Sequence, residues 1–193
     1  MELFYAMNTP SHELAELLDR EKIRSCLARL ARGEDRRNTE LIADSYWPQA
    51  VVDHGIFTGT LVDYLAWVVP GSPDIPVTQH LLGQSVIDLY TDTALVETHV
   101  LAYHRVSAES EHRDTVIGGR YLDWMDKIDN EWRISRRTMV YDWVQDLGES
   151  VNWTTGLMGM PFDANRYAGR AAGDYSERFF DDRWNPARED TTE

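Results

Sequence analysis

Two residues that could carry out acid–base chemistry stand where a fold can bring them together, namely Asp35 and His80. Asp35 lies in the segment 32–38, where a predicted helix ends, and His80 lies in the segment 78–83, where a predicted strand begins. A carboxylate that orients a histidine makes a general base that works near neutral pH. We therefore predict that the two side chains meet over a cavity, with His80 as the base and Asp35 as its partner.

The same two residues also have an ordinary structural interpretation. His80 could be a strand histidine whose hydrogen bonds are satisfied, and Asp35 could be a helix cap or a solvated charge beside Arg36 and Arg37. Their separation in the fold decides between the two interpretations, because a base and its partner must lie within hydrogen-bond reach, about 3 Å.

A third catalytic candidate is Arg137, which alternates with Met139 and Tyr141 along a predicted strand, as fits a pocket wall. Its guanidinium could stabilise a developing anion, or it could pair with an acid at the surface. Aromatic side chains could grip a flat, apolar ligand. The substrate-binding candidates are Tyr46, Trp47, Tyr103, Tyr121 and Tyr141.

Other reactive residue types have structural interpretations. His54 follows a strand end and is interpreted as structural, while His99 and His104 have opposite strand parity, so at most one of them points inward. Cys26 lies in a helical pattern and is interpreted as a buried structural thiol. The sequence has no metal-ligand spacing and no glycine-rich phosphate loop, so we expect neither a metal nor another cofactor.

Composition limits the class of protein. The chain has 193 residues, of which 42% are hydrophobic, enough for one domain with a sizeable core. Its net charge of −14 argues against nucleic acid and anionic membranes and favours a neutral substrate. No apolar run approaches the roughly 20 residues of a membrane span. The start lacks the pattern of a signal peptide, and the single cysteine excludes an internal disulfide, so we expect a cytoplasmic protein.

Hydrophobic periodicity predicts helices followed by long strands. We expect a helix from Ser11 to about Gly33, where glycine is a natural stop, and short helices at 38–45 and 61–69. Trp47-Pro48 should end the second helix. Strands are predicted at 50–57, 78–90, 94–106, 115–128 and 132–144, with a bulge at Gly118-Gly119 and a loop at 70–76. This order predicts an α+β cone, a curved antiparallel sheet wrapped around N-terminal helices.

The chain divides into three parts. Residues 1–146 form the predicted barrel, residues 147–184 an aromatic-rich C-terminal extension, and residues 185–193 a disordered tail. Because the extension is rich in both glycine and large apolar residues, we expect it to pack on the barrel or on a neighbouring subunit. A homodimer or homotrimer is therefore expected.

Several short motifs in this order resemble a known family. They are Gly33-Glu34-Asp35-Arg36, Tyr46-Trp47-Pro48, Val51-Val52-Asp53-His54-Gly55, Thr78-Gln79-His80-Leu81-Leu82-Gly83, Ala94-Leu95-Val96-Glu97-Thr98, Gly119-Arg120-Tyr121-Leu122-Asp123 and Glu131-Trp132-Arg133-Ile134-Ser135-Arg136-Arg137. Over about residues 12–145 the chain resembles the SnoaL-like branch of the nuclear transport factor 2-like superfamily, which has a cystatin-like α+β barrel. Enzymes of this branch include scytalone dehydratase, hexachlorocyclohexane dehydrochlorinase, bile-acid dehydratase and a lyase that removes formaldehyde from lignin-derived diaryl propanediols.

The resemblance implies roles for individual residues. His80 falls on the catalytic histidine of the branch, Asp35 on the carboxylate that partners it, and Arg137 near an active-site arginine of the dehydrochlorinase. The dehydratases also carry a catalytic tyrosine near the end of the first helix, where this chain has Leu30, Ala31 and Glu34. A phenolic acid would therefore come from another tyrosine, with Tyr46, Tyr103, Tyr121 and Tyr141 as candidates.

These observations favour a cofactor-independent lyase that acts on a small aromatic alcohol or diol. His80 would remove a proton, Asp35 would fix its tautomer, and a tyrosine or Arg137 would stabilise the leaving oxygen. The bond broken could be C–O, as in dehydration, or C–C, with loss of formaldehyde. The alternatives are a non-catalytic binding or assembly module on the same fold, and an isomerase or cyclase that uses the same base.

Overall fold

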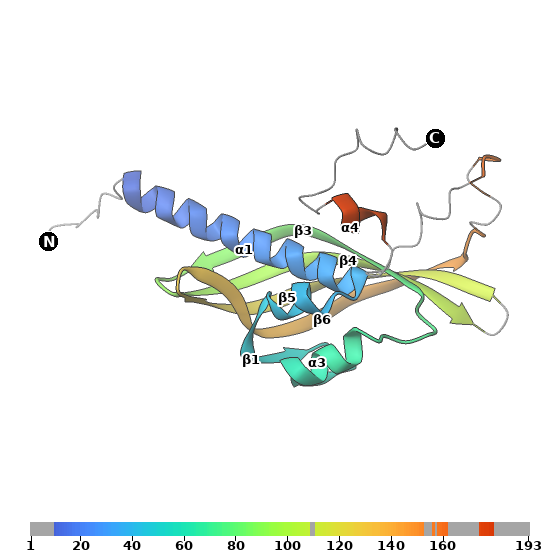
Figure 1. Cartoon of the computed structure of the whole chain (residues 1–193), viewed down its shortest axis with the longest axis horizontal. Coiled ribbons are helices and arrows are strands. Elements are labelled where there is room, and N and C mark those ends of the chain that lie inside the picture. Colours follow the sequence, from blue (N-terminus) through green and yellow to red (C-terminus); the bar gives the residue numbers. More distant parts are fainter. Residues whose placement is uncertain (1–9, 109–110, 153–155, 157, 162–173, 180–193) are drawn as a thin grey trace, which may run out of the picture.

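The computed structural model describes residues 10–108, 111–152, 156, 158–161 and 174–179 (Figure 1). The helices are α1 (Pro10–Arg36), α2 (Thr39–Ala43), α3 (Leu61–Val68) and α4 (Tyr175–Phe179). The strands are β1 (Tyr46–Asp53), β2 (Thr58–Thr60), β3 (Val77–Leu89), β4 (Thr93–Ala108), β5 (Glu111–Ile128) and β6 (Glu131–Glu149). The predicted α+β fold, with an N-terminal helix against a curved sheet, is confirmed.

One six-stranded sheet, in the order β2-β1-β6-β5-β4-β3, forms the body of the protein. Strands β3 to β6 follow one another antiparallel, whereas β1 returns parallel to β6. Asp129 and Asn130, both at positive φ, make the tight turn between β5 and β6. The long helix α1 lies along the sheet, and α3 lies beyond β1 (Figure 1).

The core explains why α1 holds its place. Its apolar stripe, with Ile23, Cys26, Leu27 and Leu30, is buried against sheet residues. Cys26 is the buried thiol that was predicted, and burial raises its pKa to about 11.

The predicted end of α1 at Gly33 is wrong. The helix continues through Gly33 to Arg36. A Cβ atom at position 33 would lie 3.0 Å from Ile42 and Leu41, so glycine here allows α1 and α2 to pack closely. Arg37 then turns the chain at φ 50°. The extra turn of helix carries Asp35.

The first strand also differs from the prediction. It begins at Tyr46 rather than at residue 50, so Trp47 and Pro48 lie in β1 and do not end a helix. The pairing of β1 with β6 shifts register between Tyr46 and Val51. Proline lacks a backbone donor and is tolerated where strand pairing is interrupted. The long strands β3 to β6 and the predicted bulge, a register shift between Gly118 and Gly119, are confirmed.

Helix α1 also contacts the outer edge of β3, which is the last strand of the sheet. Arg20 of α1 donates from Nη1 to the carbonyl oxygen of Ile87 at 2.7 Å. Further along, Asp35 accepts the backbone N–H of His80. Polar side chains of the helix therefore cover both ends of this edge.

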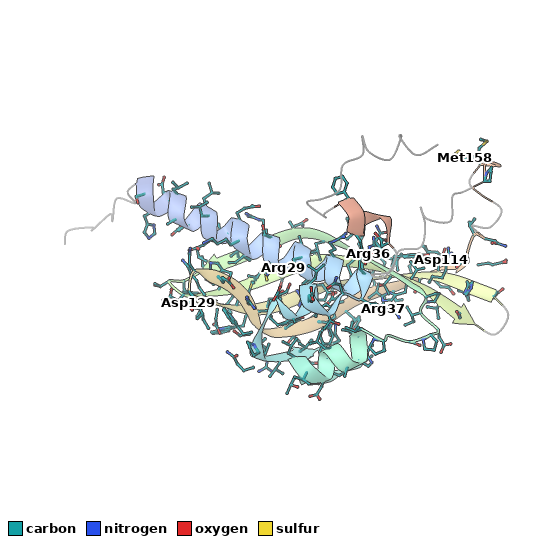
Figure 2. The ribbon with its side chains drawn as sticks, viewed as in Figure 1. Arg29, Arg36, Arg37, Asp114, Asp129 and Met158 are labelled. Atoms are coloured by element: carbon teal, nitrogen blue, oxygen red, sulfur yellow. The ribbon has the colours of Figure 1, made fainter. Side chains whose placement is uncertain are left out.

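The described part of the C-terminal extension contacts the end of α1. Arg32 donates to Ser176 Oγ at 3.1 Å, and Arg36 lies 3.4 Å from Asp174 (Arg36 is labelled in Figure 2). Much of the predicted extension and the tail 185–193 lie outside the described residues. Within the described residues no helix is both long and apolar enough to cross a membrane. The expected dimer or trimer stays a prediction.

Candidate active site

A cavity of about 200 Å³ lies between the end of α1, helix α3 and the sheet. Its polar wall includes Glu34, His54, His80 and His104, and its apolar wall includes rings and aliphatic groups from α3 and the sheet. The latter are Tyr64, Trp67, Ala102, Ile117, Tyr121 and Met139. The loop 70–76 closes one side and is held by Arg37, which donates to the carbonyl oxygens of Pro70 and Ile75 at 2.6 Å each (Arg37 is labelled in Figure 2).

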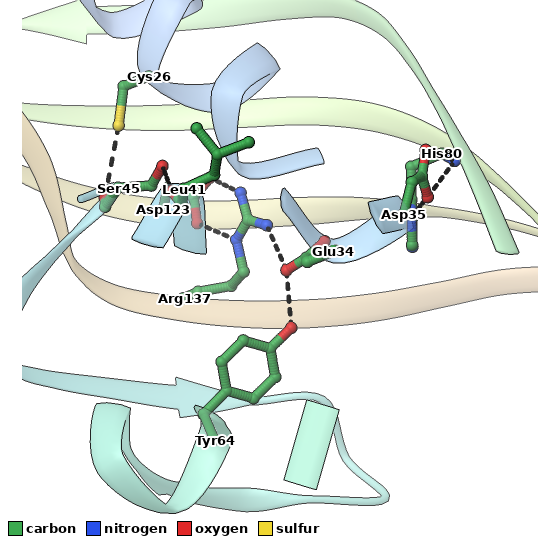
Figure 3. A network of polar contacts seen from close by, with 9 residues as sticks. All are labelled: Cys26, Glu34, Asp35, Leu41, Ser45, Tyr64, His80, Asp123 and Arg137. Carbon is green, nitrogen blue, oxygen red and sulfur yellow. Dashed lines mark hydrogen bonds and ion pairs between the residues drawn. The ribbon is translucent and has the colours of Figure 1, made fainter. Parts of the chain in front are cut away.

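Asp35 and His80 form a hydrogen-bonded pair, of which His80 lines this cavity and Asp35 lies behind it (Figure 3). His80 Nδ1 lies 2.7 Å from Asp35 Oδ1, and both carboxylate oxygens accept the backbone N–H of His80, at 3.0 and 3.1 Å. The predicted contact between the two side chains is therefore confirmed. One carboxylate fixes both the backbone and the ring of the histidine, so the ring cannot turn without losing this contact.

The pair sets the proton chemistry of His80. Burial by itself disfavours the imidazolium, but the hydrogen bond to Asp35 and the negative charge of Glu34 outweigh it, so the pKa of His80 lies above 6.5. In the neutral ring, Nδ1 carries the proton that is donated to Asp35. Nε2 then holds the lone pair, which is the arrangement that a general base needs.

A second carboxylate, Glu34, lines the cavity next to the pair. It is only 5% exposed, and its Oε1 accepts the hydroxyl of Tyr64 at 2.6 Å. The same Oε1 lies 3.9 Å from Arg137 Nη1. Tyr64 keeps its proton, because burial first and the nearby Glu34 second raise the pKa of the phenol well above 10.

Arg137 connects Glu34 to Asp123, so that Tyr64, Glu34, Arg137 and Asp123 form a second polar network beside the Asp35–His80 pair (Figure 3). It is 2% exposed and makes a two-bonded ion pair with Asp123, at 2.7 and 2.8 Å. Burial disfavours its charge, but Asp123 outweighs that cost and holds the pKa of Arg137 well above its usual range. Its guanidinium carbon lies 3.9 Å from the ring centre of Tyr121. Arg137 is thus neither a surface charge nor part of the cavity lining. It contacts two residues that do line the cavity, Tyr121 and Glu34.

The remaining histidines divide between the cavity and the solvent. His104 lines the cavity with its ring 6.2 Å from that of His80, whereas the side chain of His99 is 52% exposed, so the parity prediction is confirmed. His54 is more than a strand-end residue, because it lines the cavity and stacks on Tyr64 at 5.2 Å. Burial lowers the pKa of His54 to about 4, so its ring is neutral at pH 7.

The structure separates the aromatic candidates. Tyr121 and Tyr141 line the cavity, and Tyr141 donates to the carbonyl of His54 at 2.7 Å. Tyr46 is fully buried in the core. Trp47 donates to the carbonyl of Asp126 and stacks under Arg133.

Tyr103 donates to Asp114 at 2.7 Å. Its strand neighbours Ala102 and His104 line the cavity, and strand residues alternate between faces, so Tyr103 lies on the opposite face. The structure does not place Trp47 or Tyr103 in the cavity wall, contrary to their prediction as substrate contacts. Their side chains bind residues on other faces of the sheet.

Among the cavity residues that the sequence did not indicate, Glu34 and Tyr64 matter most, because they form a hydrogen bond in the cavity wall. The signal for Tyr64 lies in the sequence of α3, where it is a phenol on an otherwise apolar face and one turn after Leu61. No group of three or more potential metal ligands occurs in the part of the chain that the structure describes.

Comparison with known proteins places this geometry in a family. Residues 15–138 match the SnoaL-like domain family. No curated protein matches the sequence. The fold is similar to that of a scytalone dehydratase candidate from Novosphingobium aromaticivorans, at 24% identity and a TM-score of 0.61, covering 68% of this chain and 89% of that one.

Two further solved structures extend the similarity in fold. A hexachlorocyclohexane dehydrochlorinase from Novosphingobium barchaimii is 19% identical, with a TM-score of 0.61 and coverage of 78% and 98%. A protein of unknown function with a cystatin-like fold, from Nostoc punctiforme, is 16% identical, with a TM-score of 0.54 and coverage of 65% and 92%. At these identities the three structures establish the fold.

Proposed function

The chain belongs to the SnoaL-like domain family, and from this premise we propose that it is a lyase that removes a proton and a leaving group from a small aromatic alcohol or diol without a cofactor. The observation that carries the proposal is the Asp35–His80 pair at the wall of an apolar cavity. Solved structures of similar fold include a dehydratase candidate and a dehydrochlorinase. Both names denote enzymes that catalyse elimination reactions.

His80 acts as the base. Nε2 takes a proton from the substrate while Asp35 holds the Nδ1 proton and stabilises the imidazolium that forms. Such a positioned base contributes about 10²–10⁴-fold to the rate. In a dehydration, the C–H electron pair forms the new double bond, and the C–O bond breaks. The departing hydroxide takes a proton, which the imidazolium of His80 can return, and leaves as water.

The alternative bond is C–C. Here His80 takes the proton of a primary hydroxyl, formaldehyde leaves, and the electron pair of the broken C–C bond forms a double bond and expels a benzylic hydroxyl. That hydroxyl takes the proton back from the imidazolium and leaves as water. Both reactions use the same base, so the size of the cavity bears on the choice. An apolar cavity of about 150 Å³ holds one benzene ring, so a cavity of about 200 Å³ favours a one-ring substrate. A diaryl propanediol would need to place its second ring outside, near the half-exposed Tyr141.

A panel of one-ring and two-ring aromatic alcohols and diols, read by mass spectrometry, tests the proposal. Loss of water or of formaldehyde is expected with wild-type protein and not with His80→Ala. A product of unchanged mass would instead identify an isomerase or cyclase. Binding without conversion of any compound would favour the non-catalytic module.

A further inference from the structure

The cavity wall holds a carboxylate oxygen, Oε2 of Glu34, that no residue in the described part of the chain hydrogen-bonds. Tyr64 and Arg137 both approach Oε1 of Glu34, and no described residue hydrogen-bonds to Oε2. Glu34 is 95% buried in the rest of the protein and lines the cavity. Oε2 itself is not fully enclosed by the described residues, so it can accept up to two hydrogen bonds from a ligand in the cavity.

The charges around Glu34 are also unbalanced. Two carboxylates, Glu34 and Asp123, share the guanidinium of Arg137. Asp123 takes the two short bonds, at 2.7 and 2.8 Å, and Glu34 keeps one long contact of 3.9 Å. The nearest hydrogen-bond donor to Glu34 is a neutral phenol, that of Tyr64. Although Arg37 also lines the cavity, its guanidinium bonds the carbonyls of Pro70 and Ile75. At Glu34 itself the cavity therefore presents negative charge, which attracts a hydrogen-bond donor and disfavours an adjacent anion.

We propose that Glu34 binds the ligand through Oε2, and that the cavity selects aromatic alcohols that carry a second hydroxyl group. This second hydroxyl donates to Glu34, while the first reaches His80. The inference rests on the proposed function for the identity of the reacting group, and it narrows the substrate class to diols and phenolic alcohols. It also gives Glu34 a role that is distinct from the proton transfer by His80, because Glu34 hydrogen-bonds to Tyr64 and not to the histidine.

Matched ligands test the proposal by binding alone. Hydroxybenzyl alcohol, methoxybenzyl alcohol and hydroxymethylbenzoate share a ring and a primary alcohol, and they differ in one group that donates, only accepts, or carries negative charge. Each is titrated as its ortho, meta and para isomers by calorimetry, in the His80→Ala variant so that no turnover interferes. The tightest hydroxy isomer should bind at least about 10-fold better than its methoxy partner, and the benzoate should bind most weakly.

Glu34→Gln is the matched variant, because the amide has the shape of the carboxylate but can donate as well as accept. In this variant the preference for hydroxyl over methoxy should fall below about 3-fold, and the benzoate should gain affinity. An equal preference with and without the carboxylate, or no binding of any of the compounds up to millimolar concentration, would overturn the proposal.

Infrared difference spectra provide a readout that does not depend on the folding of a variant. In wild-type protein, the hydroxy compound should shift a carboxylate stretching band, and the methoxy compound should not. Identical spectra with both compounds would contradict the role of Glu34. The two proposals can fail separately: turnover that survives His80→Ala would refute the base, whereas a preference that survives Glu34→Gln would refute only the second hydroxyl site.

Discussion

Glu34 and Asp35 follow each other at the end of α1, and their carboxylates point to different partners (Figure 3). Asp35 reaches the edge strand and binds His80, whose charge changes near neutral pH. Glu34 reaches Tyr64 and Arg137, which keep their protons at neutral pH. The partner therefore decides what a buried carboxylate can do: Asp35 supports proton transfer, and Glu34 supplies a fixed charge.

The two regions also act on each other. The charge of Glu34 is one of the causes that raise the pKa of His80, while Arg137 lowers it. The balance of the second network is thus part of what makes His80 a base of suitable strength. Substitutions that affect one region and spare the other can test this comparison.

The largest expected effect is on stability, from Arg137→Met. This change leaves Asp123 and Glu34 without their shared cation in a buried site, and such a loss costs about 3–5 kcal/mol. Chemical denaturation followed by circular dichroism measures it. The matched control is Arg113→Met, because Arg113 pairs with Asp146 at the surface, and its melting temperature should barely move. Equal effects of the two changes would show that the second network is not a stabilising one.

The next effect is on turnover, from His80→Ala and Asp35→Asn. Each should lower kcat at least about 100-fold, because a general base or its partner is removed. The melting temperature should change little by comparison with Arg137→Met. His99→Ala is the control, since His99 is exposed on the neighbouring strand and should keep full activity. A variant of the pair that turns over at the wild-type rate would contradict the catalytic role.

A smaller effect tests whether the phenol of Tyr64 acts as the catalytic acid. In Tyr64→Phe, Glu34 loses its shortest hydrogen bond, and the free energy of unfolding should fall by about 2 kcal/mol. Turnover should fall by less than about 10-fold, because the phenol binds Glu34 and does not donate to the leaving group. A loss as large as that in His80→Ala would instead assign Tyr64 as the acid.

The smallest effect is a shift in the pH profile. The neutral form of His80 is the active one, so activity should rise as pH increases through its pKa, which lies above 6.5. Removing the carboxylate in Asp35→Asn takes away a cause of that rise, so the midpoint of the residual activity should move to lower pH. Steady-state rates across the acid limb measure both midpoints. A midpoint that does not move would show that another group titrates.

The Asp35–His80 pair could be predicted because its signals are local. A helix that ends, a strand that begins and two residue types of matched chemistry all lie in short segments. The long strands were predictable for the same reason, since their apolar patterns and the turn at Asp129-Asn130 are sequence features. Two boundaries were misplaced: the end of α1, because Gly33 serves packing on Ile42 and not termination, and the start of β1, because Pro48 is accommodated in the strand.

The second network depends on tertiary structure. Asp123 meets Arg137 because the hairpin pairs these two positions. Counting outward from the turn would pair Asp123 with Arg136, and the register shift between Trp124 and Met125 moves its partner to Arg137. Tyr64 reaches Glu34 only because α3 packs beside β1, which no local pattern specifies. The pairing of Glu34 and Tyr64 therefore could not be predicted, although each residue stands in plain view in the sequence.

The cover that α1 places over β3 bears on self-association of the folded protein. An outer strand offers free N–H and carbonyl groups to which a strand of another chain can add. Here Arg20 occupies the carbonyl of Ile87 and Asp35 occupies the N–H of His80, so two groups along this edge are already paired. The carboxylate that orients the histidine thus also protects the chain against edge-to-edge aggregation, and active-site geometry and colloidal stability depend on the same side chain.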